Sequence, residues 1–208
     1  MTNFKIVDVK QGSDEWLAQR LGKITASIAS QIITGTGKLS ASHESVINKA
    51  VAEKILGEPE ESFQSFYMER GAALEPDALA FVNFTYELNF EPVGFLEVSE
   101  WVGCSPDALD LENKTGLELK CPAAHTMVKY LSEGKLPKEY FQQVQFSLMV
   151  TGFEKWHFCA YHPSFPAFHC VVERDEEYIA KMEQFVSECA EKIEAKYNKL
   201  KSMIEVSK

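Results

Sequence analysis

The feature that most constrains this fold is a change of pattern between residues 91 and 120, where strand-like runs replace helical ones. Three runs in this region read E-P-V-G-F-L-E-V, W-V-G-C-S-P-D-A-L-D-L and T-G-L-E-L-K. They are short, rich in apolar residues and separated by turn residues, a combination that is typical of β-strands. The second and third runs, joined by a polar turn, predict a β-hairpin in the middle of the chain.

Helical patterns flank these strands on both sides. Helices are expected at about 13–22, 24–33, 42–56 and 68–87 before the strands and at 137–150 and 176–201 after them, with two more strands at 155–162 and 167–174. This order predicts an α/β or α+β fold with a central mixed β-sheet flanked by helices. The length of 208 residues fits a single domain over residues 1–208.

Asp107, Glu118 and Lys120 are expected to meet on the hairpin. Alternate residues of a strand share a face, so Glu118 and Lys120 project to the same side, and Asp107 reaches them from the partner strand. Carboxylates can hold Mg²⁺, a hard cation that prefers oxygen ligands, and the lysine adds a basic nitrogen. This set of groups is typical of phosphodiester hydrolysis. The alternative is a solvated strand face with a simple ion pair, although both charges interrupt an apolar run.

Arg20 and Ser27 form a second candidate site near the N-terminus. Arg20 ends one short expected helix, and Ser27 lies in the first turn of the next. A guanidinium, a hydroxyl and free helix N–H groups could therefore converge on an anion. The alternative is that Arg20 is an ordinary exposed helix residue.

The overall charge does not decide the partner. The formal net charge is −10, but residues 53–118 contain 15 acidic and 3 basic residues, which leaves 16 acidic and 18 basic residues elsewhere. An acidic belt can coexist with a basic groove, and part of the belt can be the metal site itself. The net charge therefore does not exclude a nucleic-acid substrate.

Cysteine usage and apolar patterning favour a cytoplasmic protein with no membrane partner. The five cysteines include no C-x-x-C pair, which indicates reduced thiols, and no apolar run approaches the ~20 residues of a membrane span. The first fifteen residues carry charges where a signal peptide would be apolar. A zinc site of Cys159, His162, His169 and Cys170 is the weaker alternative to a core hairpin, because its spacing matches no standard pattern.

Several motifs occur in a fixed order along the chain. They read Q-G-S-D-E-W…R-L-G-K-I-T-A-S, R-G-A-A-L-E-P-D-A, C-S-P-D-A-L, G-L-E-L-K-C-P and Q-Q-V-Q, from Gln11 to Gln145. In this combination the chain resembles the bacteriophage lambda exonuclease (YqaJ-type viral recombinase) family of the PD-(D/E)XK nuclease superfamily. The resemblance implies a restriction-endonuclease-like core.

The resemblance also implies a role for each matching residue. Asp107 and Glu118 would bind the metal together with the backbone carbonyl of Leu119, and Lys120 would orient or deprotonate the attacking water. The other matches are a helical glutamate at the same site, a glutamine that helps position the nucleophile, and a pocket for the terminal 5′-phosphate: Glu75, Gln143, and Arg20 with Ser27 and Ser105. For Glu75 and Gln143, ordinary helix surface is the alternative.

The implied activity is a Mg²⁺-dependent 5′ to 3′ exodeoxyribonuclease. It would use two Mg²⁺ ions, with Mn²⁺ as a substitute, release 5′-mononucleotides from one strand of linear duplex DNA, and leave a 3′ single strand. The implied partners are DNA ends with a 5′-phosphate, a single-strand annealing protein in recombination, and two further copies in a homotrimeric ring. The alternatives are a restriction-like or repair endonuclease with the same metal core, and a DNA-binding or assembly module with a structural ion.

Overall fold

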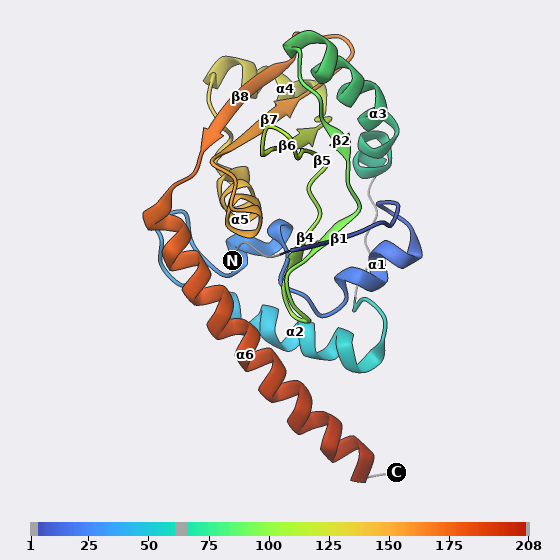
Figure 1. Cartoon of the computed structure of the whole chain (residues 1–208), viewed down its shortest axis with the longest axis vertical. Helices are drawn as coiled ribbons and strands as arrows, with labels where there is room; N and C mark the ends of the chain where they lie inside the picture. The colour runs from blue at the N-terminus through green and yellow to red at the C-terminus, as the bar shows by residue number, and fades with distance from the viewer. Residues whose placement is uncertain (1–3, 61–65, 207–208) are drawn as a thin grey trace.

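The structure is a computed structural model that describes residues 4–60 and 66–206 (Figure 1). In chain order the elements are β1 (Lys5–Val7), α1 (Asp14–Arg20), the 3₁₀ helix η1 (Ala26–Gln31), α2 (His43–Leu56), α3 (Phe66–Tyr86), β2 (Glu91–Pro92), β3 (Phe95–Glu97), β4 (Gly103–Cys104), β5 (Ala108–Asp110), β6 (Thr115–Lys120), α4 (Ala124–Glu133), the 3₁₀ helix η2 (Lys138–Tyr140), α5 (Phe141–Thr151), β7 (Lys155–Ala160), β8 (Phe168–Glu173) and α6 (Glu176–Val206).

The strands form two sheets. The central sheet has five strands in the order β2-β5-β6-β7-β8, and a smaller sheet has the order β1-β3-β4. β6 and β7 run parallel, whereas β5 and β6 are antiparallel, with Ala108 opposite Leu117. Parallel neighbours need a crossover connection, which here contains α4, η2 and α5. The predicted mixed sheet flanked by helices is confirmed.

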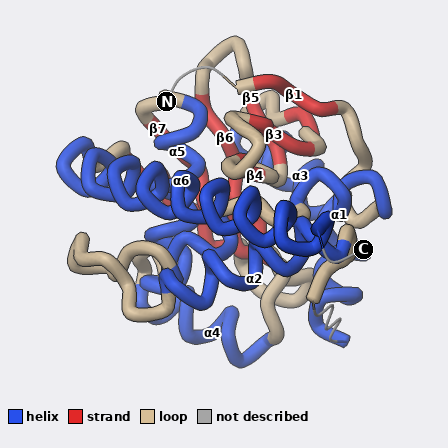
Figure 2. The backbone as a smooth tube through the Cα atoms, turned by 90° about the horizontal axis from the view of Figure 1, so that it is seen from below, coloured by secondary structure: helices blue, strands red, loops and turns tan. Residues whose placement is uncertain are grey.

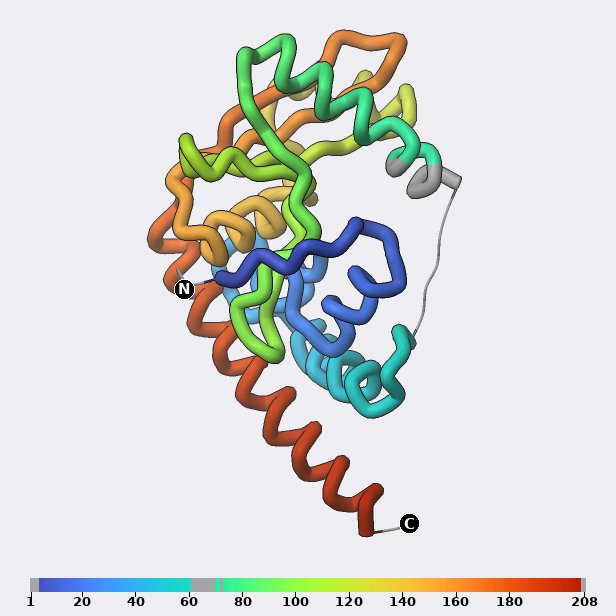
Figure 3. The backbone as a smooth tube through the Cα atoms, turned by 45° about the vertical axis from the view of Figure 1, so that its right-hand side comes forward, coloured from blue at the N-terminus to red at the C-terminus, as the bar shows by residue number. Residues whose placement is uncertain are grey.

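Helices bury both faces of β6. On one face, Leu117 and Leu119 pack against Ala78 and Val82 of α3. The other face, which carries Glu118, is covered by the crossover, whose helix α5 contacts Glu118 through Gln143. Figure 2 shows α6 running alongside α2, and Figures 1 and 3 show its C-terminal end projecting beyond the rest of the molecule. β6 is thus an interior strand, and any charge on it needs a partner.

Gly116 shows how closely β6 and β7 pack. A Cβ atom at this position would lie 2.3 Å from the ring of Trp156, the residue opposite it on β7. Trp156 is fully buried beneath the crossover. The indole therefore occupies the space that a side chain at residue 116 would need, on the same face as Glu118 and Lys120.

The strands predicted at 91–98 and 101–111 are each divided between the two sheets. The first breaks at residues 93–94 into β2 and β3, and the second at residues 105–107 into β4 and β5. The prediction of one continuous hairpin was wrong for the part before residue 105, because β4 pairs with β3 and not with β6. The segments at both breaks lie next to the candidate site described below.

The helices differ from the prediction in two places. The helix expected at 24–33 is shortened to η1, because Ile24 is drawn into a bridge with Val102 and Ile33 into one with Leu39. The helix α4 was not predicted: its N-cap is Ala123, whose side chain makes no capping hydrogen bond, so a common start signal is missing. Among the described residues, no helix combines the length and apolarity needed to cross a membrane.

Candidate active site

Asp107, Glu118 and Lys120, named here the acid cluster, meet at the centre of the main sheet. Lys120 Nζ contacts Glu118 Oε1 and lies 4.0 Å from Asp107 Oδ2. The backbone N–H of Leu119 donates to Asp107 Oδ2 at 2.6 Å, so β6 itself holds the carboxylate that precedes β5. Glu118 is 1% exposed. The predicted convergence of the three side chains is confirmed, and the alternative of a solvated strand face is wrong.

Gln143 joins the acid cluster from α5. Its Nε2 donates to Glu118 Oε1 at 2.6 Å, across 25 residues of sequence. Tyr140, the last residue of η2 and directly before α5, places its ring centroid 5.6 Å from Lys120 Nζ. The crossover therefore supplies one hydrogen bond to the buried carboxylate and one aromatic face to the lysine, and Gln143 is not ordinary helix surface.

Glu75 faces the acid cluster across a cleft of about 880 Å³, which Glu75, Asp107 and Leu119 help to line. Partial burial raises the pKa of Glu75, the nearby Asp107 carboxylate raises it further, and Lys120 opposes the shift. The side chain is exposed toward this cleft. Glu75 is thus within electrostatic reach of both Asp107 and Lys120, from α3.

The acid cluster holds more negative than positive charge. Burial raises the pKa of Glu118 to about 7, against the lowering effect of Lys120, and burial likewise raises the pKa of Asp107. Burial lowers the pKa of Lys120, but the two carboxylates outweigh this and raise it above its ordinary value. One protonated lysine serves two carboxylates, with Glu75 beyond them. A further cation at the cleft would relieve this repulsion.

The side-chain oxygens at this site suit Mg²⁺ better than a metal ion that needs many side-chain ligands. Within residues 4–60 and 66–206, no group of three or more His, Cys, Asp and Glu side chains is arranged to hold a metal ion. Asp107 and Glu118 offer two carboxylates, and Mg²⁺ is commonly held by one or two carboxylates while it retains several waters. The predicted residues therefore fit Mg²⁺ with Asp107 and Glu118 as the side-chain ligands.

The alternative zinc site is not formed. Cys159 and His169 are opposite each other on β7 and β8, but Cys170 pairs with Phe158 and so faces the other side of the sheet. His169 instead contacts His157, with ring nitrogens 2.9 Å apart. All five cysteines are free thiols in the structure.

Arg20, Ser27 and Ser105, named here the anion pocket, also come together. The guanidinium donates to Ser105 Oγ at 3.2 Å and to Ser27 Oγ at 3.0 Å. Two residues that the sequence did not indicate complete the pocket: Thr25 accepts from Arg20 at 3.4 Å, and Trp16 Nε1 donates to Ser105 at 3.0 Å. Arg20 also lies over the Trp16 ring, 4.4 Å from its centroid. Arg20 is therefore not an ordinary exposed helix residue.

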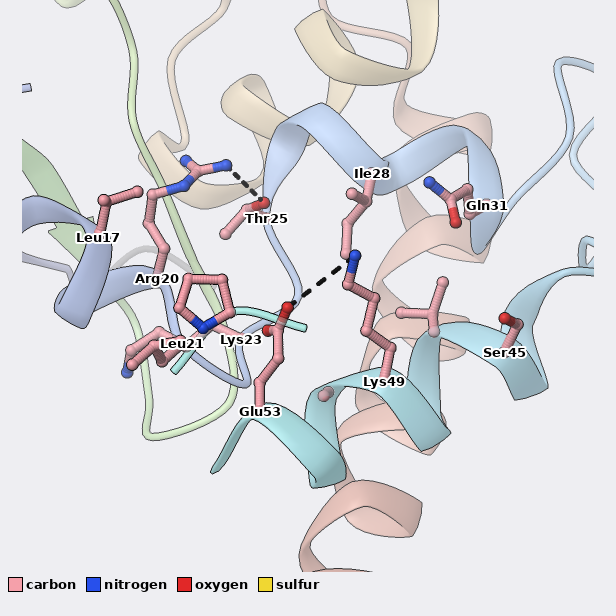
Figure 4. Close-up of a pocket in the computed structure, with 13 residues that line it drawn as sticks. Leu17, Arg20, Leu21, Lys23, Thr25, Ile28, Gln31, Ser45, Lys49 and Glu53 are labelled. Atoms are coloured by element: carbon pink, nitrogen blue, oxygen red, sulfur yellow. Dashed lines mark hydrogen bonds and ion pairs between the residues drawn. The ribbon is translucent and has the colours of Figure 1, made fainter. Parts of the chain in front are cut away.

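The hydrogen-bond partners of the cation in this pocket are hydroxyl groups. Among the side chains that the structure describes, which leave out those of residues 66–69 and 72, no Asp or Glu forms an ion pair with Arg20. Burial lowers its pKa, and Glu53 opposes this from a distance. Figure 4 shows the guanidinium reaching toward Thr25, beside a hollow of about 280 Å³ whose far side is formed by Lys49 and Glu53 of α2. A half-buried guanidinium among hydroxyl groups is suited to binding an anion.

The acid cluster and the anion pocket are adjacent. Ser105 belongs to the pocket and Asp107 to the cluster, and only Pro106 separates them in the chain. The structure thus joins a group of carboxylates that can hold a cation to a cationic pocket that can hold an anion. A cation at the carboxylates and an anionic group in the pocket would therefore lie close together.

A family model and two solved structures are similar to this chain over most of its length. The YqaJ-like viral recombinase domain matches residues 15–154. The crystal structure of an alkaline exonuclease, LHK-Exo, from Laribacter hongkongensis superposes with a TM-score of 0.82 at 29% identity, over 94% of this chain and 100% of that chain. Its complex with dAMP gives a TM-score of 0.81 at 30% identity over the same shares.

Two further proteins are similar over different extents. A phage related exonuclease from Haemophilus somnus 129PT gives a TM-score of 0.65 at 17% identity, over 88% of this chain and 96% of that chain, which supports the fold alone. An uncharacterized protein of Escherichia coli (strain K12), ExoD, is 36% identical over 58 residues, which are 26% of this chain and 67% of that protein.

Proposed function

Because the chain belongs to the YqaJ-like viral recombinase domain family, we propose that it is a DNA exonuclease that degrades one strand of linear duplex DNA from its 5′ end. The likeness to an alkaline exonuclease over nearly the whole chain supports the exonuclease class. The complex of that relative with dAMP, a nucleoside monophosphate, supports cleavage to mononucleotides. The 5′ to 3′ polarity, the 3′ single-stranded product and the use of Mg²⁺ are further parts of the proposal.

The observation that carries this proposal is the position of the anion pocket. Arg20 contacts the hydroxyls of Ser27 and Ser105, and Ser105 lies two residues before Asp107 in the chain. An enzyme that cuts within a strand does not need a separate pocket for a terminal phosphate. A pocket beside the carboxylates therefore favours an enzyme that starts from a phosphorylated end.

Each group of the acid cluster would act on the scissile phosphate or on water. Mg²⁺ held by Asp107 and Glu118, with the Leu119 carbonyl as a further ligand, would supply Lewis-acid stabilisation of the phosphate and an acidified water. Lys120 would orient the attacking water or take its proton. Gln143 would hold the Glu118 carboxylate in place through its 2.6 Å hydrogen bond. Glu75 would add negative charge at the edge of the same cleft.

The anion pocket would bind the 5′-phosphate. Two guanidinium nitrogens of Arg20 already point at hydroxyl oxygens of Ser27 and Ser105, and a phosphate oxygen could replace or bridge these contacts. Bound in this way, the end would be held beside the carboxylates, because Ser105 is two residues before Asp107. Binding energy from the terminal phosphate would then align the first phosphodiester for attack.

The assembly part of the proposal is a ring of three copies around DNA that acts with a single-strand annealing protein. A net charge of −10 disfavours retention of DNA by charge alone, and enclosure by a ring would retain it without strong attraction. Sedimentation of the active protein tests the ring: a trimer is expected, and a strict monomer would refute it. Co-purification with an annealing protein expressed from the same genome tests the partner.

The test of the activity uses a linear duplex with a 5′-phosphate on one strand only, incubated with Mg²⁺ or with EDTA, beside closed circular duplex. We expect Mg²⁺-dependent loss of the phosphorylated strand, no loss in EDTA and no cutting of the circle. Cutting of the circle would favour an endonuclease. No cutting of either substrate would leave a DNA-binding module as the remaining alternative.

A further inference from the structure

Gln11 makes a pair of hydrogen bonds that connects the anion pocket with the acid cluster. It lies in the turn between β1 and α1, and its side chain lines the same cleft as Asp107 and Glu75. Its Nε2 donates to the carbonyl of Pro106 at 2.7 Å and to the carbonyl of Val93 at 2.8 Å. Both neighbours are acceptors, so only the amide –NH₂ group fits there, and both of its protons are used.

The first of these bonds fixes the middle of a three-residue segment. Ser105, on one side of Pro106, accepts hydrogen bonds from Arg20 and Trp16 in the anion pocket. Asp107, on the other side, accepts from the backbone of β6. The second bond, to Val93, ties the same amide to the break between β2 and β3. Gln11 thus holds the segment that spans the two sites.

The backbone that carries Gln11 is itself firmly placed. Gly94 lies so close to the N-terminal segment that a Cβ atom there would be 2.2 Å from the carbonyl oxygen of Val9. The turn that contains Gln11 is closed by a hydrogen bond from the N–H of Ser13 to the carbonyl of Lys10 at 3.1 Å. The amide therefore starts from a fixed position, and its bonds can transmit that position to Pro106.

We propose that Gln11 is a positioning residue that sets the register of cleavage. By fixing residues 105–107, it would fix the spacing between a 5′-phosphate in the anion pocket and the carboxylates, so that the first phosphodiester is cut and a mononucleotide is released. This inference rests on the proposed function. Loss of the two bonds would free the segment, and a misplacement of about 1 Å in such an arrangement can cost roughly 100-fold in rate.

The first arm of the test replaces Gln11 by methionine, which keeps the length of the side chain and removes the donor. Gln184→Met, at an exposed position of α6, is the matched control. Each protein digests a duplex with a radioactive 5′-phosphate, and the labelled products of the first cut are separated by length. We expect mononucleotide alone from wild type and Gln184→Met. From Gln11→Met we expect mononucleotide mixed with longer products, and a first-cut rate lower by roughly 10- to 100-fold with KM little changed.

The second arm uses wild type, so it does not depend on the folding of the variant. The substrate carries an extra propanediol phosphate between the 5′-phosphate and the first nucleoside, and a fixed register predicts that the cut moves into the added unit. If Gln11→Met releases mononucleotide alone, whether quickly or slowly, the role of Gln11 is overturned. An unmoved cut on the extended end would also overturn it. If wild type releases no labelled mononucleotide from the ordinary end, the proposed function fails instead.

Discussion

The acid cluster and the anion pocket lie side by side but are built from different kinds of backbone. Two members of the acid cluster, Glu118 and Lys120, lie on β6, whose regular alternation places them on one face, and Asp107 lies directly before β5, the antiparallel partner of β6. The anion pocket is assembled from the end of α1, the start of η1 and the break between β4 and β5. A regular strand provides Glu118 and Lys120, whereas the ends of elements and the break between two strands provide the anion pocket.

The two sites also carry opposite imbalances of charge. The acid cluster has one lysine for two carboxylates, and the anion pocket has a guanidinium whose hydrogen-bond partners are hydroxyls. The acid cluster therefore favours a cationic ligand, which the anion pocket would repel. The anion pocket favours an anionic ligand, which the acid cluster would repel. Metal ions and a terminal phosphate would satisfy the two sites independently, so their contributions should be separable by mutation.

The largest expected effect comes from Lys120→Ala, which changes the acid cluster alone. Removing a group that positions or deprotonates water should lower the rate by about 10²- to 10⁴-fold. Preference for a phosphorylated end, measured as the ratio of rates on 5′-phosphate and 5′-hydroxyl duplexes, should survive in the residual activity. Lys135→Ala, at an exposed position, is the control. Wild-type activity in Lys120→Ala would remove the lysine from the mechanism.

Arg20→Ala should have a smaller effect that depends on the DNA end. A hydrogen bond to a charged group contributes about 1.5–3 kcal/mol, so cleavage of 5′-phosphorylated duplex should slow by roughly 10- to 100-fold, with little change on a 5′-hydroxyl end. Arg20→Lys keeps the charge without the bidentate geometry. Its rate on 5′-phosphorylated duplex should therefore lie between the rates of wild type and Arg20→Ala. Rates on both ends give the result, and an unchanged end preference would sink the phosphate role of Arg20.

Metal binding should separate the two sites in a thermal unfolding experiment. Mg²⁺ at a hundred times its dissociation constant stabilises the folded state by about 2.7 kcal/mol, which corresponds to a Tm increase of roughly 5–10 °C. We expect this increase for wild type and Arg20→Ala, measured by calorimetry, and its loss in Asp107→Asn. An equal increase in Asp107→Asn would show that the metal binds elsewhere.

The smallest expected effect is a pH dependence of the metal-free protein. Burial raises the pKa of Glu118 from 4.5 to about 7, so the folded state binds this proton more tightly than the unfolded chain does. The stability that this proton contributes is present below about pH 4.5 and is lost as the pH rises toward 7. Glu118→Gln should therefore have a higher Tm than wild type at pH 8, and the difference should shrink at pH 5. A difference that grows toward low pH would contradict the assignment.

The acid cluster could be predicted from spacing, and the anion pocket only in part. Glu118 and Lys120 are two residues apart in a strand, so their shared face follows from local geometry. Arg20 and Ser27 were indicated by their places at the end of one expected helix and the start of the next, but Ser105 lies 85 residues from Arg20, and only the family resemblance indicated it. Trp16 was missed, although it lies four residues before Arg20 on one helix, a spacing at which side chains contact each other.

The fold was predictable for elements with long, uniform patterns and less so where the chain changes sheets. The helices α2 and α6 and the strands β7 and β8 lie close to their predicted positions. The breaks at residues 93–94 and 105–107 depend on tertiary pairing: β3 finds β1 across about 90 residues of sequence, and no local signal encodes that choice. Gln11 was read only as part of a motif, because its two acceptors are backbone carbonyls that have no sequence signature.

The parallel pairing of β6 with β7 has a consequence for refolding. Gln143 lies inside the connection between these strands, and it reaches Glu118 only when the whole crossover has closed. Closing long-range pairs of this kind is slow compared with forming helices or hairpins. The three side chains of the acid cluster can therefore come together early, when the β5–β6 hairpin forms. Recovery of activity should coincide with the last step, in which β7 docks. Enzyme activity would then report on the completion of folding, and far-ultraviolet circular dichroism on its earlier stages.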